Sequence, residues 1–111
     1  MKTVDLKERA KKSDGEYVFG ADDTGSHACY MIYGTLRPGE TGRVIKPGKG
    51  HEEIVLAARG ILTVAGDFSG TLSEGSAIHL AGEQTCYLEN NGAADAVYVI
   101  AGGHAEGGHH H

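Results

Sequence analysis

The sequence lacks the features that mark several large classes of protein. No stretch approaches the ~20 consecutive apolar residues that span a bilayer, and the polar N-terminus lacks the apolar segment of a secretion signal. No basic cluster is larger than Lys11–Lys12, and the formal net charge of the 111 residues is −5. These absences argue against a membrane protein and against a nucleic-acid-binding surface. We expect one cytosolic domain.

Common catalytic and nucleotide-binding motifs are also missing. Ser-His-Asp and Cys-x-x-Cys patterns are absent, and GKGHEE lacks the Gly-Lys-Ser/Thr ending of a phosphate-binding loop, so we expect no nucleotide cofactor. The chain has two cysteines, Cys29 and Cys86, far apart in sequence. In the cytosol such thiols stay reduced, and a buried free cysteine behaves as a small hydrophobic residue.

Glycine, in contrast, is abundant: eighteen glycines separate short apolar runs. The runs predict about eight strands, over residues 16–20, 27–33, 43–46, 53–59, 61–65, 77–80, 85–89 and 96–101. Gly60 predicts a tight hairpin between the fourth and fifth strands, and residues 90–92 predict another hairpin turn. No segment is long enough for a helical crossover, which favours an all-β sandwich or barrel.

The two ends of the chain differ from this pattern. Residues 1–15 have a weak apolar face and predict a short surface helix or an arm before a barrel over residues 16–101. Residues 102–111 are too rich in glycine and polar residues to pack. The histidines of this tail, His104 and His109 to His111, could chelate metal ions or could be an expression tag.

Two partial motifs in the strand pattern resemble those of the cupin superfamily, small jelly-roll barrels. The first family motif is G-x5-H-x-H-x3,4-E-x6-G. Glu53 and Gly60 match its second half, whereas Pro47 and Lys49 stand at its two histidine positions.

The second family motif is G-x5-P-x-G-x2-H-x3-N. Gly75 and Asn90 match it at the correct separation, and Cys86 stands at its histidine position. The resemblance implies a cupin-like double-stranded β-helix of two antiparallel sheets. It also implies a homodimer in which an N-terminal strand, within residues 16–33, crosses to the partner.

In cupins the three motif histidines and the glutamate bind a metal ion, and only Glu53 carries over directly. His51, Glu53, His79 and Cys86 could form an atypical site for zinc, nickel, iron or manganese. Each has a simpler interpretation. Glu53 could pair with Lys49, Cys86 could be an apolar wall residue, and the two histidines could lie on the surface.

Lys49 suggests a different ligand. If its side chain points into the barrel, the positive charge repels a metal ion and favours an anionic organic molecule, with Tyr30 or Tyr33 as hydrogen-bonding walls. A lysine exposed on a glycine-rich turn is the alternative.

Three functions follow from these alternatives. The first is binding of a small molecule, a divalent metal or both in the barrel interior, with Lys49, Glu53, Tyr30 and Tyr33 as ligand contacts. The second is a metal-dependent enzyme of the cupin dioxygenase, isomerase or lyase type. The third is a structural role with an interior filled by side chains.

Overall fold

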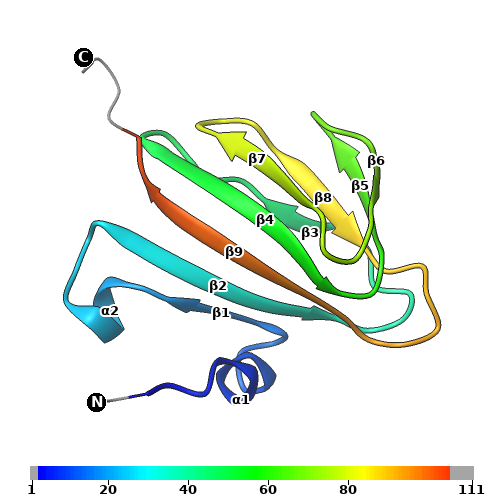
Figure 1. Cartoon of the computed structure of the whole chain (residues 1–111), viewed down its shortest axis with the longest axis horizontal. Coiled ribbons are helices and arrows are strands. Elements are labelled where there is room, and N and C mark those ends of the chain that lie inside the picture. Colours follow the sequence, from blue (N-terminus) through cyan, green and yellow to red (C-terminus); the bar gives the residue numbers. More distant parts are fainter. Residues whose placement is uncertain (1–2, 106–111) are drawn as a thin grey trace.

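The computed structural model describes residues 3–105, which form two short helices and nine strands (Figure 1). In chain order these are α1 (Leu6–Lys11), β1 (Glu16–Phe19), α2 (Ala21–Thr24), β2 (Cys29–Leu36), β3 (Arg43–Ile45), β4 (His51–Arg59), β5 (Leu62–Gly66), β6 (Gly70–Leu72), β7 (Ala77–Ala81), β8 (Cys86–Glu89) and β9 (Ala96–His104). Neither helix of the described residues has the length and apolar composition needed to cross a membrane.

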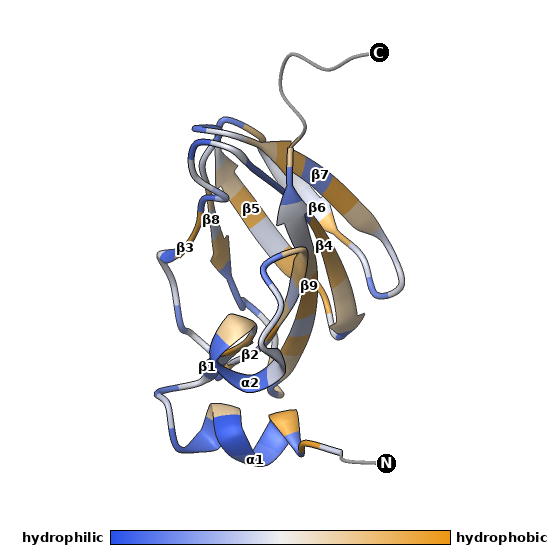
Figure 2. Cartoon of the chain, turned by 90° about the vertical axis from the view of Figure 1, so that its left-hand side faces the viewer, coloured by the Kyte–Doolittle hydropathy of each residue, from blue (hydrophilic) through white to orange (hydrophobic). Residues whose placement is uncertain are grey.

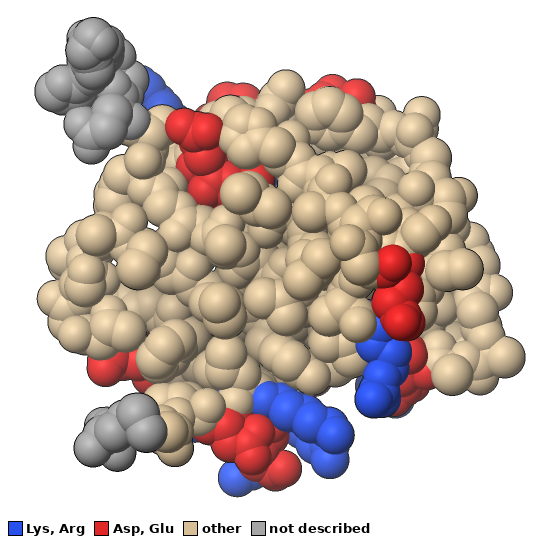
Figure 3. Space-filling model, viewed as in Figure 1, with Lys and Arg blue, Asp and Glu red and all other residues tan. Residues whose placement is uncertain are grey.

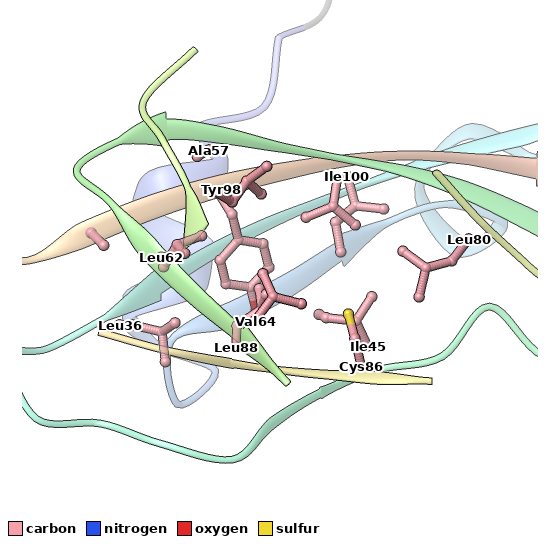
Figure 4. Close-up of a cluster of buried hydrophobic side chains, with 13 residues drawn as sticks. Leu36, Ile45, Ala57, Leu62, Val64, Leu80, Cys86, Leu88, Tyr98 and Ile100 are labelled. Atoms are coloured by element: carbon pink, nitrogen blue, oxygen red, sulfur yellow. The ribbon is translucent and has the colours of Figure 1, made fainter. Parts of the chain in front are cut away.

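The strands form two antiparallel sheets, as the sequence predicts. One sheet has the order β1-β2-β9-β4-β7 and the other β3-β8-β5-β6. Figure 2 shows the two layers facing each other. Because side chains alternate along a strand, each sheet contributes one apolar face to the space between them. Figure 4 shows the resulting core, in which Tyr98 of β9 and Leu62 of β5 approach from opposite layers.

The predicted hairpin at Gly60 is wrong. β4 and β5 belong to different sheets, so the turn at Gly60 carries the chain from one layer to the other. Gly60 has a φ of +79°, which glycine adopts without steric cost. The turn at residues 90–92 likewise connects β8 and β9 across the two layers. Turn residues identify the reversal of the chain, but not which sheet the next strand enters.

Three segments are more regular than expected. α2 occupies the predicted loop at residues 21–26, and β6 occupies the predicted loop at residues 69–75. β9 continues to His104, three residues beyond its predicted end. Gly102 pairs with β2 on one side and β4 on the other, so a segment without a large side chain is held by backbone pairing. Residues 106–111, which include His109 to His111, lie outside the described part of the chain.

Candidate functional site

Glu53 is a buried carboxyl group in an otherwise apolar layer. Along β4, the alternation turns Glu53 and Val55 toward the opposite sheet and leaves Glu52 and Ile54 on the outside. The Glu53 residue is 5% exposed. Burial raises the pKa of Glu53 because the charged form is poorly solvated, and a hydrogen bond from Tyr30 opposes part of that rise.

Tyr30 reaches Glu53 across a glycine. Tyr30 of β2 pairs with Gly102 of β9, and Gly102 pairs on its other side with Glu53 of β4. The tyrosine ring lies directly over Gly102, where a Cβ atom would sit 2.2 Å from Tyr30 Cζ. The Tyr30 hydroxyl donates to Glu53 Oε2 at 2.5 Å. Burial and this contact with Glu53 raise the pKa of Tyr30.

Two imidazole rings lie beside this pair, at the end of the barrel where β4 begins and β9 ends. His51 and His104 are paired in register, with ring centroids 4.7 Å apart. The Tyr30 ring meets His51 edge-on at 6.0 Å. His51 is partly exposed and His104 is exposed, so solvent reaches the vicinity of Glu53 from this end. Sequence reasoning counted His104 among the histidines of a tail over residues 102–111 and therefore did not place it at this end of the barrel.

Cys86 enters the same interior from the opposite sheet. It is fully buried, and Figure 4 shows it beside Ile45 in the apolar core. Burial raises the pKa of the Cys86 thiol to about 11, and the negative charge of Glu53 contributes to the rise. At neutral pH the Cys86 thiol of the metal-free chain is therefore protonated.

Three of the predicted site residues lie elsewhere. His79 is exposed on the outer face of β7, where its Nε2 atom is 2.8 Å from Glu52 Oε1. Tyr33 faces the same outer side, because it is an odd-numbered step from Tyr30 along β2. Lys49 is exposed on the turn before β4 and contributes to lowering the pKa of Glu83, after the larger effect of Lys46. The placement of Lys49, His79 and Tyr33 at the site is therefore wrong, and the alternatives of an exposed lysine and a surface histidine at position 79 describe the structure.

The residues present do not fit the metal centre of the cupin motifs. Among residues 3–105 no three histidine, cysteine or acidic side chains are close enough to hold a metal ion together. Pro47 and Lys49 stand where the motif has histidines, Cys86 belongs to the apolar core, and Glu53 is engaged by Tyr30. The arrangement is suited to hydrogen bonding, with a buried carboxyl, a phenol and two imidazoles at one end of the barrel.

Comparison with solved structures shows which known fold the chain has. A protein of Thermus thermophilus superposes with a TM-score of 0.69 at 20% identity, over 94% of this chain and 98% of the other. A Klebsiella pneumoniae protein with a double-stranded β-helix domain superposes with a TM-score of 0.62 at 13% identity, over 75% of this chain and 73% of the other. A sugar phosphate isomerase of the cupin superfamily from Silicibacter pomeroyi superposes with a TM-score of 0.64 at 17% identity, over 94% of this chain and 68% of the other.

The chain has the cupin fold. No family model and no curated protein sequence matches it. At these identities the structural likeness establishes the double-stranded β-helix fold. The chemistry of the site must be argued from the residues of this chain.

Proposed function

We propose that the protein binds a small hydroxyl-bearing molecule at the end of the cupin barrel formed by Tyr30, His51, Glu53 and His104. The observation that supports this function most strongly is the Tyr30–Glu53 hydrogen bond. A carboxyl that is 5% exposed weakens the fold unless its polar atoms find partners. Such a group retained beside a solvent-accessible end of the barrel is a candidate for ligand recognition.

A hydroxyl group suits this carboxyl in either protonation state. When Glu53 is ionised, Oε2 accepts from Tyr30 and Oε1 is available to a ligand hydroxyl donor. When Glu53 is protonated, it can donate to the oxygen of the same hydroxyl. The His51 and His104 rings, 4.7 Å apart and two residues along β4 and β9 from Glu53 and Gly102, supply further nitrogen donors and acceptors.

Binding can be tested on the full chain by NMR, with glucose, glucose 6-phosphate and glycolate as probes. We expect at least one probe to shift the amide signals of Tyr30 and Gly102, and Tyr30→Phe or Glu53→Gln to abolish the shift. Tyr33→Phe is the matched control, because that tyrosine lies on the outer side of the same strand. Shifts that persist in Glu53→Gln, or that map to another surface, would contradict the proposed site.

Metal content distinguishes this function from a metal-dependent enzyme. The full chain with His109, His110 and His111 changed to Asn removes chelation by the terminal run. We expect this variant to purify without stoichiometric zinc, nickel, iron or manganese. A stoichiometric metal that is lost on Glu53→Gln and Cys86→Ser would instead favour the enzyme of the dioxygenase, isomerase or lyase type.

We also propose that the protein is cytosolic and forms a homodimer. Residues 16–33, expected to cross to a partner, here form β1, α2 and the first part of β2, and β1 pairs with β2 of the same chain. Exchange of this strand would break that pairing. A dimer that keeps it must use another surface.

A further inference from the structure

The outer face of the five-stranded sheet is unusually apolar for a surface in contact with water. Strand register places on it Tyr17, Phe19, Cys29, Met31, Tyr33, Thr35, Glu52, Ile54, Leu56, Ala58, Arg59, Ala77, His79, Ala81, Val97, Val99, Ala101 and Gly103. Ile54, at the centre of β4, is 51% exposed, and Met31 and Leu56 beside it are also exposed. Figure 3 views this face and shows charged side chains mainly at its margins.

This composition differs from that of a solvated sheet face. An antiparallel sheet with one face in water normally alternates apolar and polar residues, and continuous exposed apolar area marks a contact surface. Of the outward-facing strand residues, only Glu52, His79 and Arg59 are acidic or basic, and Glu52 and His79 are hydrogen-bonded to each other at 2.8 Å. The centre of the face therefore offers a partner apolar area and almost no polar groups.

The charges at the two ends of β4 are opposite. Glu52 lies at its beginning. At its other end, Arg59 lines a cavity of about 540 Å³ together with Lys7 and Lys11 of α1 and Asp95. The outer face is thus acidic at one end of β4 and predominantly basic at the other, with the apolar centre between them.

We propose that this outer face binds a second copy of the chain, sheet against sheet, with the two β4 strands running antiparallel. Two copies packed face to face can be related by a two-fold axis along the strands or across them. An axis along the strands places Glu52 near the partner's Glu52. An axis across them places Glu52 near the partner's Arg59 and Ile54 beside the partner's Leu56. Charge complementarity selects the second arrangement.

This interface goes beyond the proposed ligand site and is independent of it. Glu53 and Tyr30 point into the barrel, whereas Glu52 and Ile54 point away from it. It also leaves β1 paired with β2 of its own chain. Substitutions on the outer face should change association without changing the amide shifts that a ligand causes around Gly102.

The test is sedimentation equilibrium of the full chain in EDTA, which prevents its histidines from bridging copies through metal ions. We expect a dimer for the natural sequence and a dissociation constant raised at least about tenfold by Ile54→Arg, because a charge would be buried at the centre of the interface. Val44→Arg is the matched control. Val44 is 53% exposed but lies on β3 of the other sheet, so its substitution should leave association unchanged.

Charge reversal tests the orientation without placing a charge at the centre of the face. Glu52→Arg should weaken the dimer, and Glu52→Arg combined with Arg59→Glu should restore it. A monomer at every soluble concentration, or equal effects of Ile54→Arg and Val44→Arg, would overturn the interface. A dimer weakened by Ile54→Arg, yet indifferent to both charge variants, would overturn the antiparallel arrangement.

Discussion

Two tyrosine–glycine–glutamate rows cross the inner face of the five-stranded sheet, and they differ in how their charges are compensated. In one, Tyr30 of β2 crosses Gly102 of β9 to reach Glu53 of β4. In the other, Tyr98 of β9 crosses Gly34 of β2 and donates to Glu16 of β1. Each tyrosine passes over a neighbouring strand where a Cβ atom would collide with its ring.

The Tyr98 row is closed by an arginine from the other sheet. Arg43 Nη1 donates to the Tyr98 hydroxyl at 2.7 Å, and Nη2 donates to the Thr35 carbonyl at 3.2 Å. Tyr98 is fully buried, and the guanidinium compensates the acidic end of its row. This row ties β1, β2, β9 and β3 together and is structural.

Among residues 3–105 no arginine or lysine forms an ion pair with Glu53, and the Tyr30 row ends beside solvent. Burial raises the pKa of Glu53, and the Tyr30 hydrogen bond and the neighbouring His51 offset only part of that rise. In both rows a tyrosine crosses a glycine to reach a glutamate. The charge of the glutamate is compensated by Arg43 in the Tyr98 row, and no arginine or lysine of the described residues compensates it in the Tyr30 row. This difference is the reason why we propose ligand binding at the Tyr30 row.

The largest effect should come from filling Gly34, the glycine position of the Tyr98 row. Gly34→Ala places a Cβ 2.0 Å from Tyr98 Cζ, and the buried ring has no space to move. We expect a loss of about 3 kcal/mol or more in urea unfolding. Gly102→Ala should cost less, about 1–2 kcal/mol, because the partly exposed Tyr30 ring can swing outward. Gly103→Ala, where a Cβ would meet the Ala28 carbonyl at 3.2 Å, is the milder control. Equal losses at Gly34 and Gly102 would remove the distinction between the two rows.

Removing the compensating cation should be the next largest effect. Arg43→Met leaves the Tyr98 hydroxyl and Glu16 without their guanidinium, and we expect a loss of about 1.5–3 kcal/mol in the unfolding free energy. Arg37→Met is the matched control. Both arginines lie near Glu40, but the Arg37 side chain is 85% exposed and that of Arg43 only 15%. Arg37→Met should lower the unfolding free energy by at most about 0.5 kcal/mol. A comparable loss in both variants would show that Arg43 does not stabilise the Tyr98 row.

The pH dependence of stability should distinguish Glu53. Its pKa is raised in the folded chain, so between the ordinary glutamate pKa and the raised one the folded state holds a proton that the unfolded state has released. The unfolding free energy therefore falls as pH rises through that window. Glu53→Gln should remove this part of the slope, whereas Glu8→Gln, at an exposed position on α1, should retain it. If the unfolding free energies of Glu53→Gln and Glu8→Gln depended on pH with the same slope, the raised pKa of Glu53 would be contradicted.

The smallest perturbation is a labelling experiment on the two cysteines. Cys29 is exposed, and Cys86 is fully buried with a thiol pKa raised to about 11. Brief treatment of the native chain with iodoacetamide near neutral pH should modify Cys29 and leave Cys86 unmodified, as measured by mass spectrometry of peptides. Unfolding in urea should make both reactive. Rapid native labelling of Cys86 would show an open interior at that point.

Strand alternation predicted a large part of the fold and of the inward side chains. It places Glu53 on the inner face of β4, and the motif fragment places Cys86 opposite, as found. What could not be predicted depends on strand order. The crossing of Gly102 by Tyr30 requires that β9 lie between β2 and β4, which no local pattern reveals. For the same reason His104 was assigned to a tail and not to the site, since only its pairing with His51 distinguishes it from a tail residue.

The ¹³C NMR titration of the Glu53 side-chain carboxyl, in the natural sequence and in Tyr30→Phe, tests the central claim most directly. We predict that Glu53 titrates above the ordinary glutamate range. The Tyr30→Phe change should raise its pKa further, because the hydroxyl donor that favours the ionised form is removed. A Glu53 that titrates in the ordinary range, and does not respond to loss of the Tyr30 hydroxyl, would contradict the account of the site.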